Sequence, residues 1–305
     1  MKRLATIAIM LVAVTLPTGP DLGRAQSPSL TAPRLHTSVE IDSRDVFIYR
    51  YALENGAAST AAIWRLTIDI SLPAGASRLS ALGIAHGPGY FVPELSGPGR
   101  TLRTGEAIAV GLSAPQPGWR TTVGNDATAR WVAANDAALI SPKRRLAGFS
   151  VASHGPPALR RFTVAPHIDP RLAPVEPAQP DALEAERFEQ EFEHYVESHS
   201  VTGLTLGPSA LKAMTPDALL ANLASQVAQA RTLRWISNDA MARNVTDKLQ
   251  SARKAIGQKQ VDASRKILGA LRTEVAALSG KGFTSEAVAL MDVNVQYVLR
   301  LHAKR

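Results

Sequence analysis

The chain has 305 residues, 45% of them hydrophobic, and carries a formal net charge of +8 at pH 7. It contains no cysteine, which excludes disulfides, thiolate zinc sites and cysteine nucleophiles. A chain of this length without disulfides can bury the cores of two ordinary domains. The positive charge permits an anionic partner, such as polysaccharide or lipid headgroups, but it is also the ordinary solubility charge of an exported protein.

The first 25 residues have the pattern of a secretory signal. Lys2 and Arg3 precede an apolar run over residues 4–16, and prolines and the small-residue site 23–25 follow. We therefore predict export, with cleavage after Ala25, to the periplasm or the medium. The apolar run is shorter than the ~20 residues that a membrane-spanning helix needs, so an uncleaved anchor is the lesser alternative. No transmembrane segment is expected after cleavage, and residues 26–34 form a linker.

Period-two patterns dominate residues 35–168. The apolar members of two such runs are Phe47, Tyr49, Tyr51 and Leu53, then Trp64, Leu66, Ile68, Ile70 and Leu72. This alternation is typical of strands with one buried face. Further strands are expected over residues 107–112, 129–133, 148–152 and 161–164. Asn55-Gly56 is a strong turn signal, which predicts that the first two strands are neighbours.

Glycine- and proline-rich turns separate these strands, at residues 87–89, 97–99, 115–118 and 155–157. Many short strands broken in this way indicate an antiparallel β-sandwich. The order is similar to that of immunoglobulin-like domains of bacterial secreted proteins.

A proline-rich segment at residues 169–180 predicts a semi-rigid spacer and a domain boundary, so the two halves should fold independently. Asp181 with Glu184 then opens a helix. Its apolar positions are Leu183, Phe188, Phe192, Tyr195 and Val196, and its glutamates are Glu186, Glu189, Glu191, Glu193 and Glu197. The acidic face is interpreted either as solvated or as docking on a basic neighbour in the chain. Residues 200–213 have no assignment, so 181–214 is an acidic helix with a connector.

Residues 215–305 predict four amphipathic helices. Three starts place an apolar residue before a hydroxyl cap and another four places after it. These are Met214-Thr215 with Leu219, Ile236-Ser237 with Met241, and Phe283-Thr284 with Val288. Gly257 and Gly280 suit helix ends, because glycine tolerates the left-handed conformation. Short connections make neighbouring helices antiparallel, which predicts an up-and-down bundle.

The helical segment resembles the FIMAH domain, a small module near the C-terminus of secreted multidomain bacterial proteins. The residues that carry the resemblance, clearest over 235–299, are Lys248-Leu249, Ala252, Ala263, Leu268, Ala270, Val275, Ser279-Gly280-Lys281, Phe283 and Ala287. The resemblance implies no catalytic or ligand-binding residue.

Asn294 departs from that family pattern, which usually has a small apolar residue there. It falls within the apolar arc of the last helix. We expect it either to be buried and bonded to a neighbouring helix, with Ser264 as the candidate partner, or to lie at a wet rim.

Two residue sets are candidates for binding. The possible anionic-surface set is Lys248, Arg253, Lys254, Lys259, Arg265, Lys266 and Arg272, and the possible sugar-stacking set is Tyr90, Trp119 and Trp131. For both sets a structural role, as solvated helix faces or as core aromatics, is the alternative.

No catalytic constellation is found, and no cofactor or metal is predicted. The group Glu193, His194, Glu197 and His199 lacks metal-site spacing, and Ser113 and Ser153-His154 lack the context of a nucleophile.

The sequence therefore predicts a multidomain α and β protein, an immunoglobulin-like sandwich followed by a helical bundle. The leading hypothesis is an exported non-enzymatic protein that binds or displays something outside the cytoplasm, with no nucleic-acid partner. One alternative is a polysaccharide-binding accessory protein, which predicts an exposed row of aromatics. The other is a hydrolase with an unrecognised site, which predicts convergent carboxylates or a Ser/His pair in a cleft.

Overall fold

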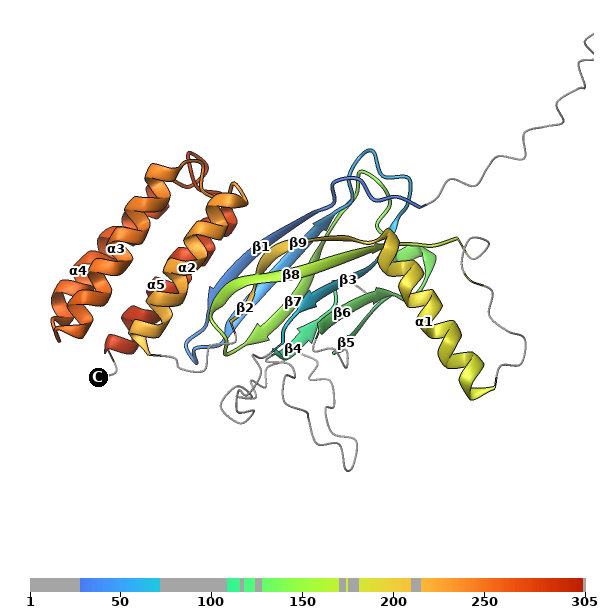
Figure 1. The fold of residues 1–305 in the computed structure, drawn as a ribbon, viewed down its shortest axis with the longest axis horizontal. Coiled ribbons are helices and arrows are strands. Elements are labelled where there is room, and N and C mark those ends of the chain that lie inside the picture. Colours follow the sequence, from blue (N-terminus) through green and yellow to red (C-terminus); the bar gives the residue numbers. More distant parts are fainter. Residues whose placement is uncertain are drawn as a thin grey trace, which may run out of the picture.

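The structure, a computed structural model, describes residues 28–71, 109–115, 118–123, 128–169, 174, 181–209 and 215–303. It contains two antiparallel sheets, of four and five strands, and five α-helices, so the chain is a mixed α and β protein. Four of the helices stand side by side at one end of the strands, and the fifth lies at the other end (Figure 1). Among the described residues, no helix is long and apolar enough to cross a membrane. The predicted signal, residues 1–25, lies outside them.

The four-stranded sheet has the order β1-β2-β7-β4. Its strands are β1 (Arg34–Ile41), β2 (Phe47–Glu54), β7 (Arg145–Ser153) and β4 (Ala109–Ser113). All three pairings are antiparallel. The predicted strands over residues 107–112 and 148–152 thus lie in the same sheet.

The five-stranded sheet has the order β5-β6-β3-β8-β9. Its strands are β5 (Trp119–Val123), β6 (Thr128–Ala133), β3 (Ile63–Asp69), β8 (Pro157–Pro166) and β9 (Val201–Pro208). The last strand comes from the segment that the sequence left unassigned, and it pairs with β8 along its whole length. The sheet region therefore does not end at residue 168, because its edge strand follows the proline-rich segment.

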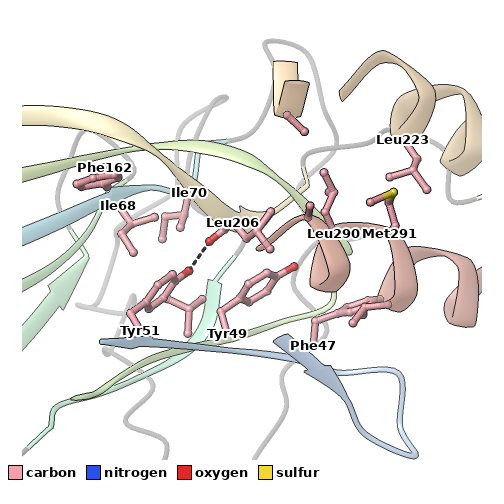
Figure 2. Packing of buried hydrophobic residues seen from close by; sticks show 14 of the residues in the cluster. Phe47, Tyr49, Tyr51, Ile68, Ile70, Phe162, Leu206, Leu223, Leu290 and Met291 are labelled. Atoms are coloured by element: carbon pink, nitrogen blue, oxygen red, sulfur yellow. Dashed lines mark hydrogen bonds between the residues drawn. The ribbon is translucent and has the colours of Figure 1, made fainter. Parts of the chain in front are cut away.

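Aromatic side chains fill the space between the sheets. Tyr51 of β2 meets Trp131 of β6 edge to face at 6.2 Å, and Phe149 of β7 meets both Trp119 and Trp131. The Tyr51 hydroxyl donates to the Leu206 carbonyl of β9 at 3.0 Å (Figure 2). These contacts cross from one sheet to the other, so the inner faces share one core.

Two strand predictions need correction. Asn55 does not form a hairpin turn between β2 and β3, which lie in different sheets; its buried amide instead donates to the Ala61 and Ile140 carbonyls. The pairing of β3 with β8 is also irregular between Ile63 and Arg65. That irregularity takes Trp64 out of phase with Leu66 and places it with the residues beneath the acidic helix.

The four predicted C-terminal helices are present as α2 (Pro216–Thr232), α3 (Asp239–Gly257), α4 (Val261–Ala277) and α5 (Ser285–Ala303). Together they are called the helical unit. Thr215 caps α2 by accepting from Ala218 N–H at 3.2 Å. Asn238, one residue after the expected Ser237, caps α3 by accepting from Met241 N–H. Met214 lies outside the described residues, while the other two staple residues, Ile236 and Phe283, are buried and bridge each other.

Of the two glycines expected to end helices, one is confirmed. Gly280 has a φ of +71° just after α4, as a left-handed terminator requires. Gly257 is the last residue of α3 itself, and Lys259 takes the left-handed conformation instead, with a φ of +61°.

The helical unit packs on the sheets through α2 and α5, while α3 and α4 lie on the far side (Figure 1). Leu290 and Met291 of α5 and Leu223 of α2 lie beside the core residues of the strands (Figure 2). Phe47 of β2 meets Tyr297 of α5 edge to face at 5.1 Å. The hydrophobic core therefore continues from the sheets into the helical unit.

The acidic helix is α1 (Ala182–His199), and Asp181 and Glu184 form the predicted capping box. Phe192, Tyr195 and Val196 pack against Trp64, Ala165 and Ile168 on the outer side of the five-stranded sheet. Glu193 pairs with Arg65 of β3 at 2.9 Å. The helix thus docks on a basic residue of its own chain. The other glutamates of its acidic face are exposed, namely Glu186, Glu189, Glu191 and Glu197.

Candidate functional site

Four of the seven predicted cationic residues are engaged in ion pairs. Arg253 of α3 pairs with Asp217 of α2 at 2.9 Å, and Arg272 of α4 pairs with Asp292 of α5 at 2.6 Å. Lys248 of α3 pairs with Glu274 of α4. These three pairs lie along three different seams between helices. Antiparallel packing could have gathered several of the cations on one side of the helices, but the structure distributes these three around the helical unit.

Arg265 is the fourth paired cation. It lies 3.7 Å from Asp262, and its guanidinium also donates to the His302 carbonyl near the end of α5. That second bond places a positive charge at a helix C-terminus, where it is stabilising. The role of Arg265 is therefore at least partly structural.

The remaining three cations, Lys254, Lys259 and Lys266, are exposed and have no carboxylate partner within the described part of the chain. Lys254 is near the end of α3, Lys259 is in the connection and Lys266 is in the second turn of α4. They therefore surround the α3–α4 connection, which we call the hairpin end. Both helices lie on the side of the helical unit away from the sheets (Figure 1).

The sugar-stacking prediction is wrong for both tryptophans. Trp131 is completely buried and Trp119 is 6% exposed. Their indole N–H groups donate to the Ser113 and Ala138 carbonyls. Their ring faces are covered by core neighbours and cannot meet a sugar. Tyr90 lies outside the described residues.

Three of the other groups considered for chemistry, Ser153, Glu193 and His199, have structural partners. Ser153 is buried, and its hydroxyl accepts from Gly155 N–H at 3.0 Å. Glu193 pairs with Arg65, and His199 Nδ1 lies 2.8 Å from the Tyr195 carbonyl. In the described ranges no three His, Asp or Glu side chains come together as metal ligands would.

Sequence reasoning missed the polar contacts that join the helical unit to β8. Asn294 of α5 is 2% exposed, and its amide donates to the Pro157 carbonyl at 2.8 Å and to the Leu290 carbonyl at 2.7 Å. Gln226 of α2 accepts from Leu159 N–H at 2.9 Å. Asn294 is thus buried, as one of the two expectations held, but it bonds to a carbonyl of strand β8 and not to a neighbouring helix. The hydroxyl of the expected partner, Ser264, is buried and has no hydrogen-bond partner among the described residues.

The reason for these contacts lies in the pairing of β8. Ser209 N–H donates to the Pro156 carbonyl at 2.7 Å, so in the alternating antiparallel pattern the Pro157 carbonyl and the Leu159 N–H point away from β9. On that side β8 pairs with β3 only over residues 162–166. The side chains of Asn294 and Gln226 therefore supply a donor and an acceptor where no strand does. A polar residue in the apolar arc of a helix was the signal for the Asn294 contact.

A further set of contacts holds the other side of the helical unit. Arg300 of α5 donates to the Asp42 carbonyl at 2.6 Å and lies 3.4 Å from the Asp45 carboxylate. His36 of β1 lies between Glu54 and Glu286 at 3.7 and 3.9 Å. Both ends of the β1–β2 hairpin are thereby attached to α5.

Comparison with known proteins gave no match to any protein-family model, to any curated protein or to any solved structure.

Proposed function

We propose that the chain is an exported, non-enzymatic protein that presents the hairpin end of its helical unit to an anionic partner outside the cytoplasm. In this proposal the two sheets are an immunoglobulin-like β-sandwich, and the helical unit is an up-and-down bundle of the FIMAH kind. Export rests on the signal-like pattern that ends at Ala25.

The observation that carries the proposal is the position of Lys254, Lys259 and Lys266. The helical unit is attached to the sheets through α2 and α5, which leaves α3 and α4 facing away. The three lysines are exposed at the hairpin end without carboxylate partners in the described part of the chain. Unpaired, clustered cations on a projecting surface attract polyanions, and the attraction is screened by salt.

The experiment uses the mature chain from Gln26, tested on an array of acidic and neutral polysaccharides and on vesicles with anionic headgroups. Binding should favour the acidic probes and weaken steeply between about 0.05 M and about 0.5 M salt. The variant Lys254→Glu, Lys259→Glu, Lys266→Glu should lose binding.

The matched control reverses three exposed cations elsewhere, as Arg34→Glu, Arg243→Glu, Lys281→Glu. It has the same net charge as the test variant, so it isolates position from total charge. Equal loss in both variants, or binding that ignores salt, would contradict a specific site at the hairpin end.

A further inference from the structure

The N-terminal half of α1 extends beyond the strands as an arm (Figure 1). Only the second half of the helix reaches the sheet, through Phe192, Tyr195 and Val196. In the arm, residues 182–191, Leu183 is 66% exposed, and Phe188 stacks on Phe192 but on no residue of the sheet. An amphipathic helix that extends past its own support leaves part of its surface available to another partner.

The arm is strongly acidic in a basic chain. Between Asp181 and His199 there are seven acidic residues and one arginine, whereas the whole chain has a net charge of +8. Glu186, Glu189, Glu193 and Glu197 follow one another at helical spacing, so they form one acidic stripe. Glu193, where the stripe meets the sheet, is paired with Arg65, and the other three glutamates are exposed.

The outer face of the five-stranded sheet has the complementary character. Alternate residues of each strand point away from the core, and one row of outward residues crosses all five strands. In strand order these are Thr122, Arg130, Thr67, Thr163 and Thr202. None of them is buried. Exposed Arg120 and Arg161 lie on the same face, and neither has an ion-pair partner in the described part of the chain.

This face also carries Leu204, on edge strand β9 and opposite Arg161 in the register. Leu204 is 40% exposed. Among the described residues, the large hydrophobic side chains that are most exposed are Leu183, Leu204 and Val261. The first belongs to the arm and the second to the sheet face, so each of the two surfaces has an apolar contact point as well as its charges.

We propose that two copies of the chain associate about a two-fold axis, with the arm of each copy lying on the outer sheet face of the other. A two-fold interface is self-complementary, so one contact between arm and face is automatically repeated in reverse. The stripe glutamates Glu186 and Glu189 of each arm then lie near the cationic side chains Arg120 and Arg161 of the partner's face, and the exposed Leu183 gains an apolar surface to pack against.

The spacings of the two surfaces agree. Glutamates one turn apart on a helix are separated by about 5.4 Å, and neighbouring strands are about 4.8 Å apart. The ten-residue arm is about 15 Å long, and a row across five strands spans about 19 Å. An arm lying across the strands therefore reaches over about four of them.

A polyanion fits this face less well than a second copy. The acidic stripe of α1 borders the same side of the sheet, because Glu193 reaches Arg65, two residues before Thr67 of the row on β3. The negative charge of that stripe repels a polyanion. The arginines on the face of a second copy, in contrast, attract the stripe. Two arms cannot pair directly with each other, because both are acidic.

The first test measures the mass of the mature chain by light scattering and by sedimentation, at protein concentrations from about 1 μM to about 100 μM. A mass of two chains at low salt, shifting toward one chain at about 0.5 M salt, is expected. A mass of one chain throughout, or a mass that grows without limit as in an open filament, overturns the two-fold arrangement.

The second test uses charge reversal in two variants. Glu186→Arg with Glu189→Arg makes the arm basic, and Arg120→Glu with Arg161→Glu makes the face acidic. Each variant alone should be a single chain, because like charges then meet. An equal mixture should recover the two-chain mass, since each arm again meets a face of opposite charge. Two variants that stay dimeric alone, or a mixture that does not recover, overturn the proposal.

The matched control is Glu191→Arg with Asp247→Arg, which changes net charge as the first variant does but lies outside the acidic stripe. It should remain dimeric. Circular dichroism of each variant must match the wild type, so that loss of association is separated from loss of fold. The hairpin-end lysines are unchanged in all these variants, so this test is independent of polyanion binding there.

Discussion

Replacement of Asn294 tests how the helical unit is attached to the sheets. Its side-chain amide is buried on α5 and donates to the Pro157 carbonyl of β8. That carbonyl points away from β9, on the side where β8 has no strand partner at this position. Asn294→Leu fills nearly the same space but cannot donate, so it removes the hydrogen bond without opening a large cavity.

The size of the effect follows from which acceptor is left unpaired. The Leu290 carbonyl, the second partner, also accepts the backbone N–H four residues later in the helix, so its loss costs little. The Pro157 carbonyl has no such substitute, because no strand pairs with β8 on that side of Pro157. A buried polar group without a partner costs about 1–3 kcal/mol. We therefore expect Asn294→Leu and Asn294→Ala each to lower the free energy of unfolding by about that amount.

The measurement is urea-induced unfolding followed by circular dichroism, with the free energy extrapolated to zero denaturant. Gln250→Leu, at an exposed position of α3, is the control and should change stability by no more than ~0.5 kcal/mol. If both Asn294 variants also stay within ~0.5 kcal/mol of the wild type, the contact with Pro157 does not hold the helical unit on the sheets.

Two further predictions concern the same core. Gln226→Leu should lower the unfolding free energy by about 1–3 kcal/mol because it leaves Leu159 N–H without its acceptor; in a double-mutant cycle with Asn294→Leu, a coupling below ~0.5 kcal/mol would show that the two contacts act separately. Burial raises the pKa of Tyr49 and of Tyr51. Both stay neutral when tyrosines of the unfolded chain ionise near pH 10, so stability should fall as pH rises above about 10. Unfolding free energies that are flat between about pH 9 and about pH 11 would contradict this.

The C-terminal helices could be predicted from sequence because their signals are local. Thr215 and Thr284 accept hydrogen bonds from N–H groups three residues on, as a cap does. The error of one residue at Ser237 has a local cause too, since Ser237 and Asn238 are adjacent and asparagine caps as well as serine does. The conformation of Lys259 could not be foreseen, because lysine rarely adopts a positive φ.

Contacts between distant segments could not be predicted. The strand Val201–Pro208 contains two glycines and a proline, which hide its period, and it becomes a strand by pairing with β8. Thr205 then meets Thr37 of β1 at 2.5 Å, which joins the edges of the two sheets. The burial of Trp119 and Trp131 likewise depends on which strands face each other, and the sequence does not record that.

The candidate binding residues likewise had local features that could be predicted and distant contacts that could not. Their positions on α3 and α4 were predicted from periodicity, but their ion pairs were not. Each of three cations pairs with a carboxylate on a helix other than its own: Arg253, Lys248 and Arg272. Only the arrangement of helices decides whether a cation is free to bind or is already neutralised.

The most direct test of this architecture is to cut the chain in the proline-rich segment, at a specific protease site inserted after Pro174. The sequence alone predicted two independent halves, whereas the structure places β9 and the helical unit, both after the cut, against β8 and β1, both before it. We predict that the cut fragments stay together through native size-exclusion chromatography and unfold in one transition. Two separate folded fragments would contradict it.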